Sequence, residues 1–154
     1  NKLLTIKRGT DSSPSSDILN ITDAAGTTDL LRITYDGMLK IHPTASSPAV
    51  VAGTSAGTGP TLLISGSDTS GIITLTTGTS CATSNTVLTA TFNSLHLSFA
   101  PGVVLYPMNT NAAALSGNAQ VYTNSTTTTF IIKVGSTALV DATQYIWAYK
   151  LAAY

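Results

Sequence analysis

The fold of this chain is decided by two stretches, Ile73-Thr74-Leu75-Thr76 and Val87-Leu88-Thr89-Ala90-Thr91-Phe92. Apolar residues and threonines alternate in both, and successive side chains of a β-strand point to opposite faces of a sheet. Each stretch therefore predicts a strand with one buried face and one hydrated face. Threonine is β-branched and suits a pleated, half-buried surface, whereas no segment of the chain sustains the period of a helix.

Outward from these stretches, residues 60–154 divide into short strands separated by turns. Ala100-Pro101-Gly102 and Ser116-Gly117-Asn118 carry the Gly, Pro, Asn and Ser that favour such turns. This pattern predicts an all-β fold, an antiparallel, jelly-roll-like β-sandwich. At residues 111–115 we expect one helical turn at most. The expected strands are 62–65, 71–77, 86–92, 102–106, 119–124, 128–134 and 144–151.

Composition limits the classes of function. Of the 154 residues, 43% are hydrophobic and 9% are charged, against about 25% charged residues in ordinary soluble domains. The formal net charge of +0 gives no basic surface for nucleic acid or an anionic membrane. The longest uncharged stretch, 69–132, is interrupted throughout by Thr, Ser, Asn and Gly, so we expect no membrane insertion.

The charges also divide the chain into parts. Ten of the fourteen charged residues precede residue 43. The segment His42-Pro43-Thr44-Ala45-Ser46-Ser47-Pro48 and then the residues from Gly53 to Pro60 are rich in Pro, Ser and Gly, a composition typical of linkers. We therefore expect an N-terminal arm at 1–42, a linker at 43–59 and the sandwich at 60–154.

The arm contains a short repeat of two apolar residues, one polar residue and one apolar residue. Its copies are Leu3-Leu4-Thr5-Ile6, Ile18-Leu19-Asn20-Ile21, Leu30-Leu31-Arg32-Ile33 and Met38-Leu39-Lys40-Ile41. Residues two apart share one face of a strand, so the repeat predicts a one-sided apolar stripe. The members of the stripe are Leu4, Ile6, Leu19, Ile21, Leu31, Ile33, Leu39 and Ile41.

This arm is too short to bury its stripe alone. Domains of about 40 residues rarely fold without disulfides, metal or oligomerisation, and the arm has no cysteine and no cluster of metal ligands. A regular repeat with a one-sided stripe suits winding around a symmetry axis. We therefore expect the stripe to be an oligomerisation surface, buried against copies of the same chain. The alternative is a β-meander packed within one chain.

Residues for catalysis or metal binding are scarce. The chain has two histidines, His42 and His96, and one cysteine, Cys81, whereas a zinc site needs three or four ligands. The sandwich has two acids, Asp68 and Asp141. Glycoside hydrolysis needs two carboxyl groups roughly 5–10 Å apart at one cleft. We expect no enzyme, no metal site and no cofactor, and a depolymerase stays open only if these two carboxyl groups meet.

Three aromatic residues alternate on the last expected strand. Tyr145, Trp147 and Tyr149 therefore share one face of that strand. One interpretation is packing in the core of the sandwich or between subunits. The other is a platform on which sugar rings stack, which would make the chain a carbohydrate-binding, receptor-recognition module of a tail fibre.

Several stretches carry a resemblance to known proteins. In the arm they are Asp29-Leu30-Leu31-Arg32-Ile33 and Asp36-Gly37-Met38-Leu39-Lys40-Ile41. In the sandwich part they are Gly59-Pro60-Thr61, Gly71-Ile72-Ile73-Thr74-Leu75-Thr76-Thr77-Gly78-Thr79-Ser80, Val104-Leu105-Tyr106-Pro107, Asn111-Ala112-Ala113-Ala114-Leu115-Ser116-Gly117, Ser136-Thr137-Ala138-Leu139 and Tyr145-Ile146-Trp147-Ala148-Tyr149. The sandwich stretches look like the β-sandwich module at the C-terminal ends of phage fibre-like and spike-like proteins. The arm resembles the short trimerising repeats that precede such modules.

This resemblance implies a structural role in a virus particle. Members of the family are fibre, spike or decoration components, and they share no catalytic residues. The chain would then be a homotrimeric fibre or capsid-decoration protein of a phage virion, displayed on the extracellular virion surface. Its expected partners are its own copies, other virion proteins and, in host attachment, a glycan of the host surface.

The scarcity of charge carries one more expectation, for the edges of the sheets. Exposed edge strands are normally protected by Lys or other charged residues, and the part of the chain after residue 42 has only Asp68, Lys133, Asp141 and Lys150. We expect the edges to be covered instead by neighbouring subunits or by long loops such as 93–101.

Overall fold

The computed structural model describes residues 19–22, 24–26, 29–33, 39–41, 46–93, 99–116 and 120–152. The chain forms two compact units, Asn1–Ala45 and Ser46–Tyr154, and each is described by itself. Leu4, Ile6, His42 and His96 lie outside the described residues.

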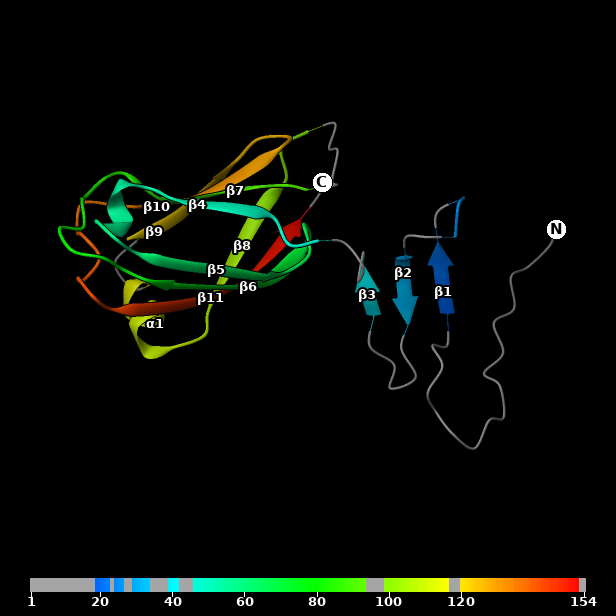
Figure 1. Cartoon of the computed structure of the whole chain (residues 1–154), viewed down its shortest axis with the longest axis horizontal. Coiled ribbons are helices and arrows are strands. Elements are labelled where there is room, and N and C mark those ends of the chain that lie inside the picture. Colours follow the sequence, from blue (N-terminus) through cyan, green and yellow to red (C-terminus); the bar gives the residue numbers. More distant parts are fainter. Residues whose placement is uncertain are drawn as a thin grey trace. The chain divides into compact units, whose positions relative to one another are not determined.

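The first unit contains a small antiparallel sheet with the order β1-β2-β3 (Figure 1). Its strands are β1 (Leu19–Thr22), β2 (Asp29–Ile33) and β3 (Leu39–Ile41). They coincide with the last three copies of the repeat, because each copy places apolar residues two apart and so favours a strand with one apolar face. Between β1 and β2 the chain turns through residues 24–26, where Gly26 has a φ of 68°.

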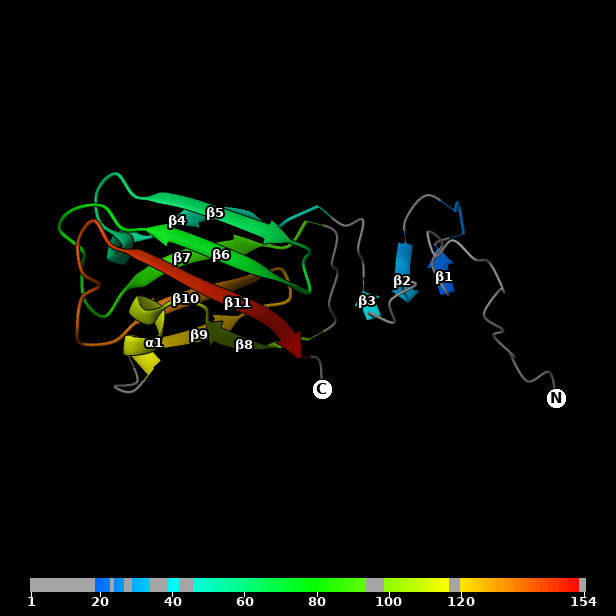
Figure 2. The same ribbon diagram turned by 90° about the horizontal axis from the view of Figure 1, so that it is seen from below.

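The second unit is a sandwich of two antiparallel sheets, which confirms the expected all-β class. One sheet has the order β4-β7-β10-β9 and the other β5-β6-β11-β8. Figures 1 and 2 show β5, β6 and β11 forming one layer and β4, β7 and β10 the other. The strands are β4 (Ala49–Ala52), β5 (Thr61–Gly66), β6 (Ser70–Thr76), β7 (Thr86–Thr91), β8 (Gly102–Pro107), β9 (Val121–Ser125), β10 (Thr129–Val134) and β11 (Gln144–Ala152).

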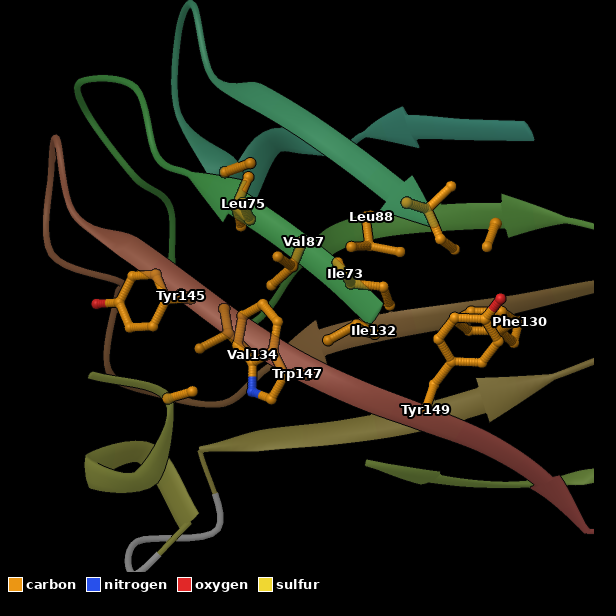
Figure 3. Packing of buried hydrophobic residues seen from close by; sticks show 14 of the residues in the cluster. Ile73, Leu75, Val87, Leu88, Phe130, Ile132, Val134, Tyr145, Trp147 and Tyr149 are labelled. Carbon is orange, nitrogen blue, oxygen red and sulfur yellow. The ribbon is translucent and has the colours of Figure 1, made fainter. Parts of the chain in front are cut away.

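The core lies between the two sheets and follows the alternation in the sequence. In β6, Ile73 and Leu75 are fully buried, and β10 contributes Phe130, Ile132 and Val134 in the same way. Figure 3 shows these side chains meeting between the layers. Burying each such side chain contributes about 1.5–3 kcal/mol, so the interior supplies the main stabilisation of a unit that has no disulfide.

The predicted linker at 43–59 is wrong from residue 46 onward. Strand β4 pairs with β7, from Ala49 opposite Thr91 to Ala52 opposite Leu88. The 3₁₀ helix η1 (Thr54–Ala56) follows, and its Ser55 and Ala56 are buried. The segments rich in Pro, Ser and Gly therefore lie on either side of β4, a short strand that contains two β-branched valines and forms the edge of a sheet. Residues 42–45 lie outside the described part.

The prediction of one helical turn at most is also wrong, because the helix is longer. Helix α1 (Thr110–Ser116) has seven residues, about two turns. The Asn109 side chain starts it by accepting a hydrogen bond from the Ala112 N–H at 2.9 Å. The Asn109 amide also donates to the Gln144 carbonyl at 2.9 Å and so ties the helix to β11.

Hydroxyl groups link the two sheets along their sides. The Thr123 hydroxyl of β9 donates to the Val103 carbonyl of β8 at 3.0 Å, and the Ser125 hydroxyl donates to the Pro101 carbonyl. On the other side, the Ser47 hydroxyl donates to the Gly66 carbonyl of β5 at 3.1 Å. The carbonyl groups of Gly66, Pro101 and Val103, at the edges of one sheet, thus accept from side chains that lie in the edge strands of the other sheet or just before them. Of the loop 93–101, residues 94–98 lie outside the described part, so its expected role stays a prediction.

Candidate functional site

The first candidate is the apolar stripe of the small N-terminal sheet. Strand pairing sets Leu19 opposite Ile33 and Ile21 opposite Leu31. In an antiparallel sheet, directly opposite residues share a face, so these four residues form two neighbouring rows on one face. The backbone register continues both rows into β3, with Leu39 opposite Ile33 and Ile41 opposite Leu31.

The register separates this apolar face from a polar row. Asn20 pairs with Arg32, and Arg32 pairs with Lys40, at the positions that alternate with the apolar rows. The repeat therefore builds an amphipathic sheet in which every copy contributes the same two positions to the apolar rows. Leu4 and Ile6, the first predicted pair, lie outside the described residues.

The apolar rows are incompletely covered in a single chain. The Ile21 side chain is 45% exposed, and Leu19, Leu31 and Ile33 are half-buried. Full burial of a Leu or Ile side chain contributes about 1.5–3 kcal/mol, and at Ile21 a substantial part of this is unrealised. Three strands of three to five residues bury little surface by themselves, so covering these rows would add substantially to the stability of the sheet.

The second candidate was the glycan-stacking platform of Tyr145, Trp147 and Tyr149, and this prediction is wrong. All three side chains are only 2% exposed. They do share one face of β11, but that face points into the sandwich (Figure 3). The three residues are therefore core residues, in which aromatic rings bury large apolar areas. A ring inside the core has no free face on which a sugar could stack.

The contacts of these rings explain their burial. Tyr145 stacks on Trp147 with ring centroids 5.7 Å apart and an interplanar angle of 7°. Phe130 of the facing sheet packs against Tyr149 at 5.2 Å. The Tyr145 hydroxyl accepts from the Val140 N–H at 3.0 Å, and the Tyr149 hydroxyl donates to the Ser67 carbonyl. Both phenols thus keep a hydrogen-bond partner inside the core.

Glycine at position 71 makes room for Tyr149. A Cβ added to Gly71 would lie 2.7 Å from the Tyr149 ring and 2.2 Å from the Ser65 carbonyl oxygen. Burial, and secondarily the charge of Asp68, raises the pKa of the Tyr149 phenol.

The two acids of the sandwich do not form a catalytic pair. Asp68 lies in the turn before β6, is 2% exposed, and accepts from the Asn93 N–H at 2.8 Å. Asp141 lies in the connection between β10 and β11. In this connection the Thr143 N–H donates a hydrogen bond to the hydroxyl of Thr77, the residue that follows β6. The two carboxyl groups are therefore separated by the length of β6, roughly 20 Å for seven strand residues, well beyond the spacing that glycosidases use.

Asp141 instead anchors a loop. Its carboxylate accepts from the N–H groups of Ser80 and Cys81 at 2.9 and 3.1 Å, and these hydrogen bonds lower the pKa of the carboxyl group. Burial, and then the neighbouring Asp141, raises the pKa of the Cys81 thiol, which keeps it in its less reactive protonated form.

The described part of the chain also lacks two other features that would suggest a function. It contains no group of three or more His, Cys, Asp and Glu residues that could hold a metal ion. It also contains no helix long and apolar enough to cross a membrane.

Sequence reasoning missed a set of exposed apolar residues on the sheet β5-β6-β11-β8. Leu63, Tyr106 and Met108 are 65%, 54% and 55% exposed. A signal was present in the sequence, because Leu62-Leu63-Ile64 and Val103-Val104-Leu105-Tyr106 are continuous apolar runs that strict alternation does not produce.

Comparisons of the chain with models of protein families, with curated proteins and with solved structures found no match. The function must therefore be inferred from the geometry of the molecule itself.

Proposed function

We propose that this chain is a non-enzymatic structural component of a phage particle, a homotrimeric fibre or capsid-decoration protein. In this proposal the apolar rows of β1, β2 and β3 join the copies, and the sandwich is the displayed module. The observation that carries the proposal is the pair of apolar rows, Leu19–Ile33–Leu39 and Ile21–Leu31–Ile41, set by the register of the N-terminal sheet.

Two further observations support association with identical copies. Each copy of the repeat supplies equivalent residues to the rows, so identical chains related by a rotation axis would present identical surfaces to one another. In the backbone register, the polar positions Asn20, Arg32 and Lys40 alternate with the rows and so stand apart from such a contact. A trimer is the state that the resemblance to trimerising fibre repeats implies.

Light scattering on the purified full chain tests the oligomer. We expect a mass of three times 15.8 kDa at micromolar concentration. Replacing both members of one pair, Ile21→Asn with Leu31→Asn, should dissociate the trimer because it places two amides in an apolar contact.

The matched control is Asn20→Thr, which lies on the same strand at the alternate, polar position. It should leave the mass unchanged. The emission of Trp147, buried in the sandwich, should stay the same in both variants if only the arm is affected. A wild-type chain that stays monomeric at micromolar concentration would contradict the proposal.

A separate measurement tests the place of the chain in the particle. Mass spectrometry of purified particles of the virus that encodes the chain should detect its peptides in a stoichiometry divisible by three. A chain found only in the infected cell, and never in particles, would contradict a virion role. The alternative of a carbohydrate-binding module is not supported, because the residues expected to stack on sugars, Tyr145, Trp147 and Tyr149, are buried.

A further inference from the structure

Two connections lie side by side at one end of the sandwich (Figures 1 and 2). Residues 77–85 join β6 to β7, and residues 135–143 join β10 to β11. A backbone hydrogen bond from the Ala142 N–H to the Gly78 carbonyl, at 3.0 Å, ties one connection to the other. This end of the sandwich is therefore built from loops that hold one another in place.

Residues 80–83 of the first connection, which we call the strap, run between two anchor points. Before the strap, Thr58 and Thr79 exchange two backbone hydrogen bonds, at 2.7 and 3.1 Å. After it, the Ser84 N–H donates to the Gly135 carbonyl at 2.7 Å. Both ends of the strap are thus fixed to neighbouring loops through the backbone.

One side chain holds the strap between these anchor points. The carboxylate of Asp141, in the second connection, accepts hydrogen bonds from the N–H groups of Ser80 and Cys81 at 2.9 and 3.1 Å. Hydrogen bonds to an ionised acceptor are stronger than those between neutral groups. Because the two donors belong to successive residues, the carboxylate fixes both the position and the direction of the strap at its start.

The backbone on either side of this contact is strained. Ser80 and Ala142, the residue after Asp141, have φ angles of 60° and 51°, in the left-handed region that disfavours residues with a Cβ. Such conformations persist only where surrounding contacts hold them. The hydrogen bond from the Ser80 N–H to Asp141 is such a contact, so loss of the carboxylate would let Ser80 relax and the strap move.

The strap carries the single thiol of the chain. The Cys81 side chain is partly buried and packs against the hydrophobic core. Its Sγ lies against the Gly57 backbone, since a Cβ added to Gly57 would be only 3.1 Å away. The thiol also forms a hydrogen bond with the Asp141 carboxylate. The closed strap therefore keeps the thiol between the core and Asp141, and movement of the strap would bring it into solvent.

We propose that the strap opens locally while the sandwich stays folded, and that Asp141 is an acid-released clasp that holds it closed over Cys81. This inference goes beyond the proposed oligomeric function and does not depend on it. The anchor points at Thr79 and Ser84 confine the opening to the strap. An opening of this size breaks few contacts and leaves the core intact, as in the local openings of other proteins.

Acid acts on the clasp in a defined direction. The N–H groups of Ser80 and Cys81 stabilise the ionised carboxylate and lower the pKa of Asp141 from its ordinary value of 3.8. The titratable neighbour on the facing connection is Cys81, whose thiol stays protonated in acid because its pKa is raised. The clasp is therefore fully formed above pH 3.8 and is lost as the pH falls below it.

Labelling of Cys81 in the full chain with two thiol reagents measures the opening. One reagent is small, methyl methanethiosulfonate, and the other is bulky, a pyridyl disulfide of fluorescein. Both attack through the thiolate, so the ratio of the bulky rate to the small rate cancels changes in thiol pKa and reports access alone. In the wild type this ratio should be well below that of free cysteine, and it should rise as the pH falls below 3.8.

Asp141→Asn, which mimics the protonated carboxyl group, provides the variant. At neutral pH its ratio should exceed that of the wild type by about tenfold, the order expected for the loss of a hydrogen bond to a charged group. Its ratio should show no further rise in acid. The matched control is Ser136→Ala, an exposed position on the same connection, which should label like the wild type. Emission from the buried Trp147 should stay native throughout.

Each remaining outcome counts against the strap or the clasp. A wild-type ratio equal to that of free cysteine at neutral pH means that the strap does not cover the thiol. Equal ratios in the wild type and Asp141→Asn show that the carboxylate does not hold the strap. A rise that coincides with loss of native Trp147 emission is unfolding of the sandwich and overturns local opening. A wild-type ratio that stays constant below pH 3.8, with Trp147 native, overturns release by acid.

Discussion

The hydroxyl of Thr77 donates a hydrogen bond to the carbonyl of Val140, with 2.7 Å between the two oxygens. The same hydroxyl oxygen accepts from the Thr143 N–H at 2.9 Å. Thr77 is 4% exposed, so one buried side chain satisfies both a donor and an acceptor of the connection between β10 and β11. This connection brings β11 back over the core with its backbone groups paired.

Thr77→Val should therefore destabilise the protein. Valine keeps the shape of threonine but leaves the Val140 carbonyl and the Thr143 N–H without this partner, at a cost of about 1–3 kcal/mol. Chemical denaturation measures the change. Thr76→Val, at the neighbouring half-buried position, is the control and should have a smaller effect. Equal stability of the two variants would show that the Thr77 hydroxyl contributes little.

Ser55→Ala should leave the free energy of unfolding unchanged or raise it. The Ser55 side chain is fully buried, and within the described part of the chain its hydroxyl has no hydrogen-bond partner. Removing an unsatisfied hydroxyl is neutral or stabilises by up to about 1 kcal/mol. Ser67→Ala is the matched comparison, because the buried Ser67 hydroxyl lies 3.0 Å from that of Thr69, and its loss should lower the unfolding midpoint. A clear loss of stability in Ser55→Ala would contradict this prediction, because it would mean that the Ser55 hydroxyl does form a stabilising hydrogen bond.

Alkaline pH should destabilise the sandwich through Tyr149. Burial raises the pKa of this phenol above its ordinary value of 10.0, so above that pH the unfolded chain releases a proton that the folded chain retains. The stabilising contribution is fully present below pH 10 and falls as pH rises, by up to about 1.4 kcal/mol per pH unit. Tyr149→Phe should remove this part of the slope, whereas Tyr122→Phe should keep it because Tyr149 is retained. Identical slopes in all three proteins would contradict the assignment.

Trp147 offers a direct optical test of the buried aromatic cluster. It is the single tryptophan of the chain and is 2% exposed. Its emission should be blue-shifted and resistant to iodide quenching, and denaturation should remove both properties. Host-surface glycans should leave the emission unchanged. A spectral shift on adding a glycan would reopen the sugar-stacking interpretation.

The sequence predicted most strands because their burial has the period of a strand. Residues that alternate in the sequence, such as Ile73 and Leu75, also alternate between core and surface. Strand β4 was not predicted, because Ala49–Ala52 is short and is flanked by Pro48 and Gly53. Its partner β7 also lies more than thirty residues further along the chain. Local composition could not reveal a strand whose stability comes from such a distant pairing.

The candidate sites show the same limit. Alternation correctly placed Tyr145, Trp147 and Tyr149 on one face of a strand, but it does not tell which face points inward. The other face of β11 carries the apolar Ile146 and Ala148 between Gln144 and Lys150, and contacts such as that of Phe130 with Tyr149 show that the aromatic face is the buried one. In the N-terminal sheet the repeat did predict the rows containing Leu19, Ile21, Leu31 and Ile33, because strand spacing alone determines their positions.

The hydroxyl bridges from Thr123 and Ser125 to the carbonyls of Val103 and Pro101 have a consequence for crowded surfaces. An open strand edge is a template on which further chains add as in a cross-β fibril, and the hazard grows with local concentration. Here an incoming strand would first have to displace hydroxyl groups that already occupy edge carbonyls. At this edge two carbonyl groups are therefore blocked by neutral side chains, and this local protection does not weaken when salt screens charges.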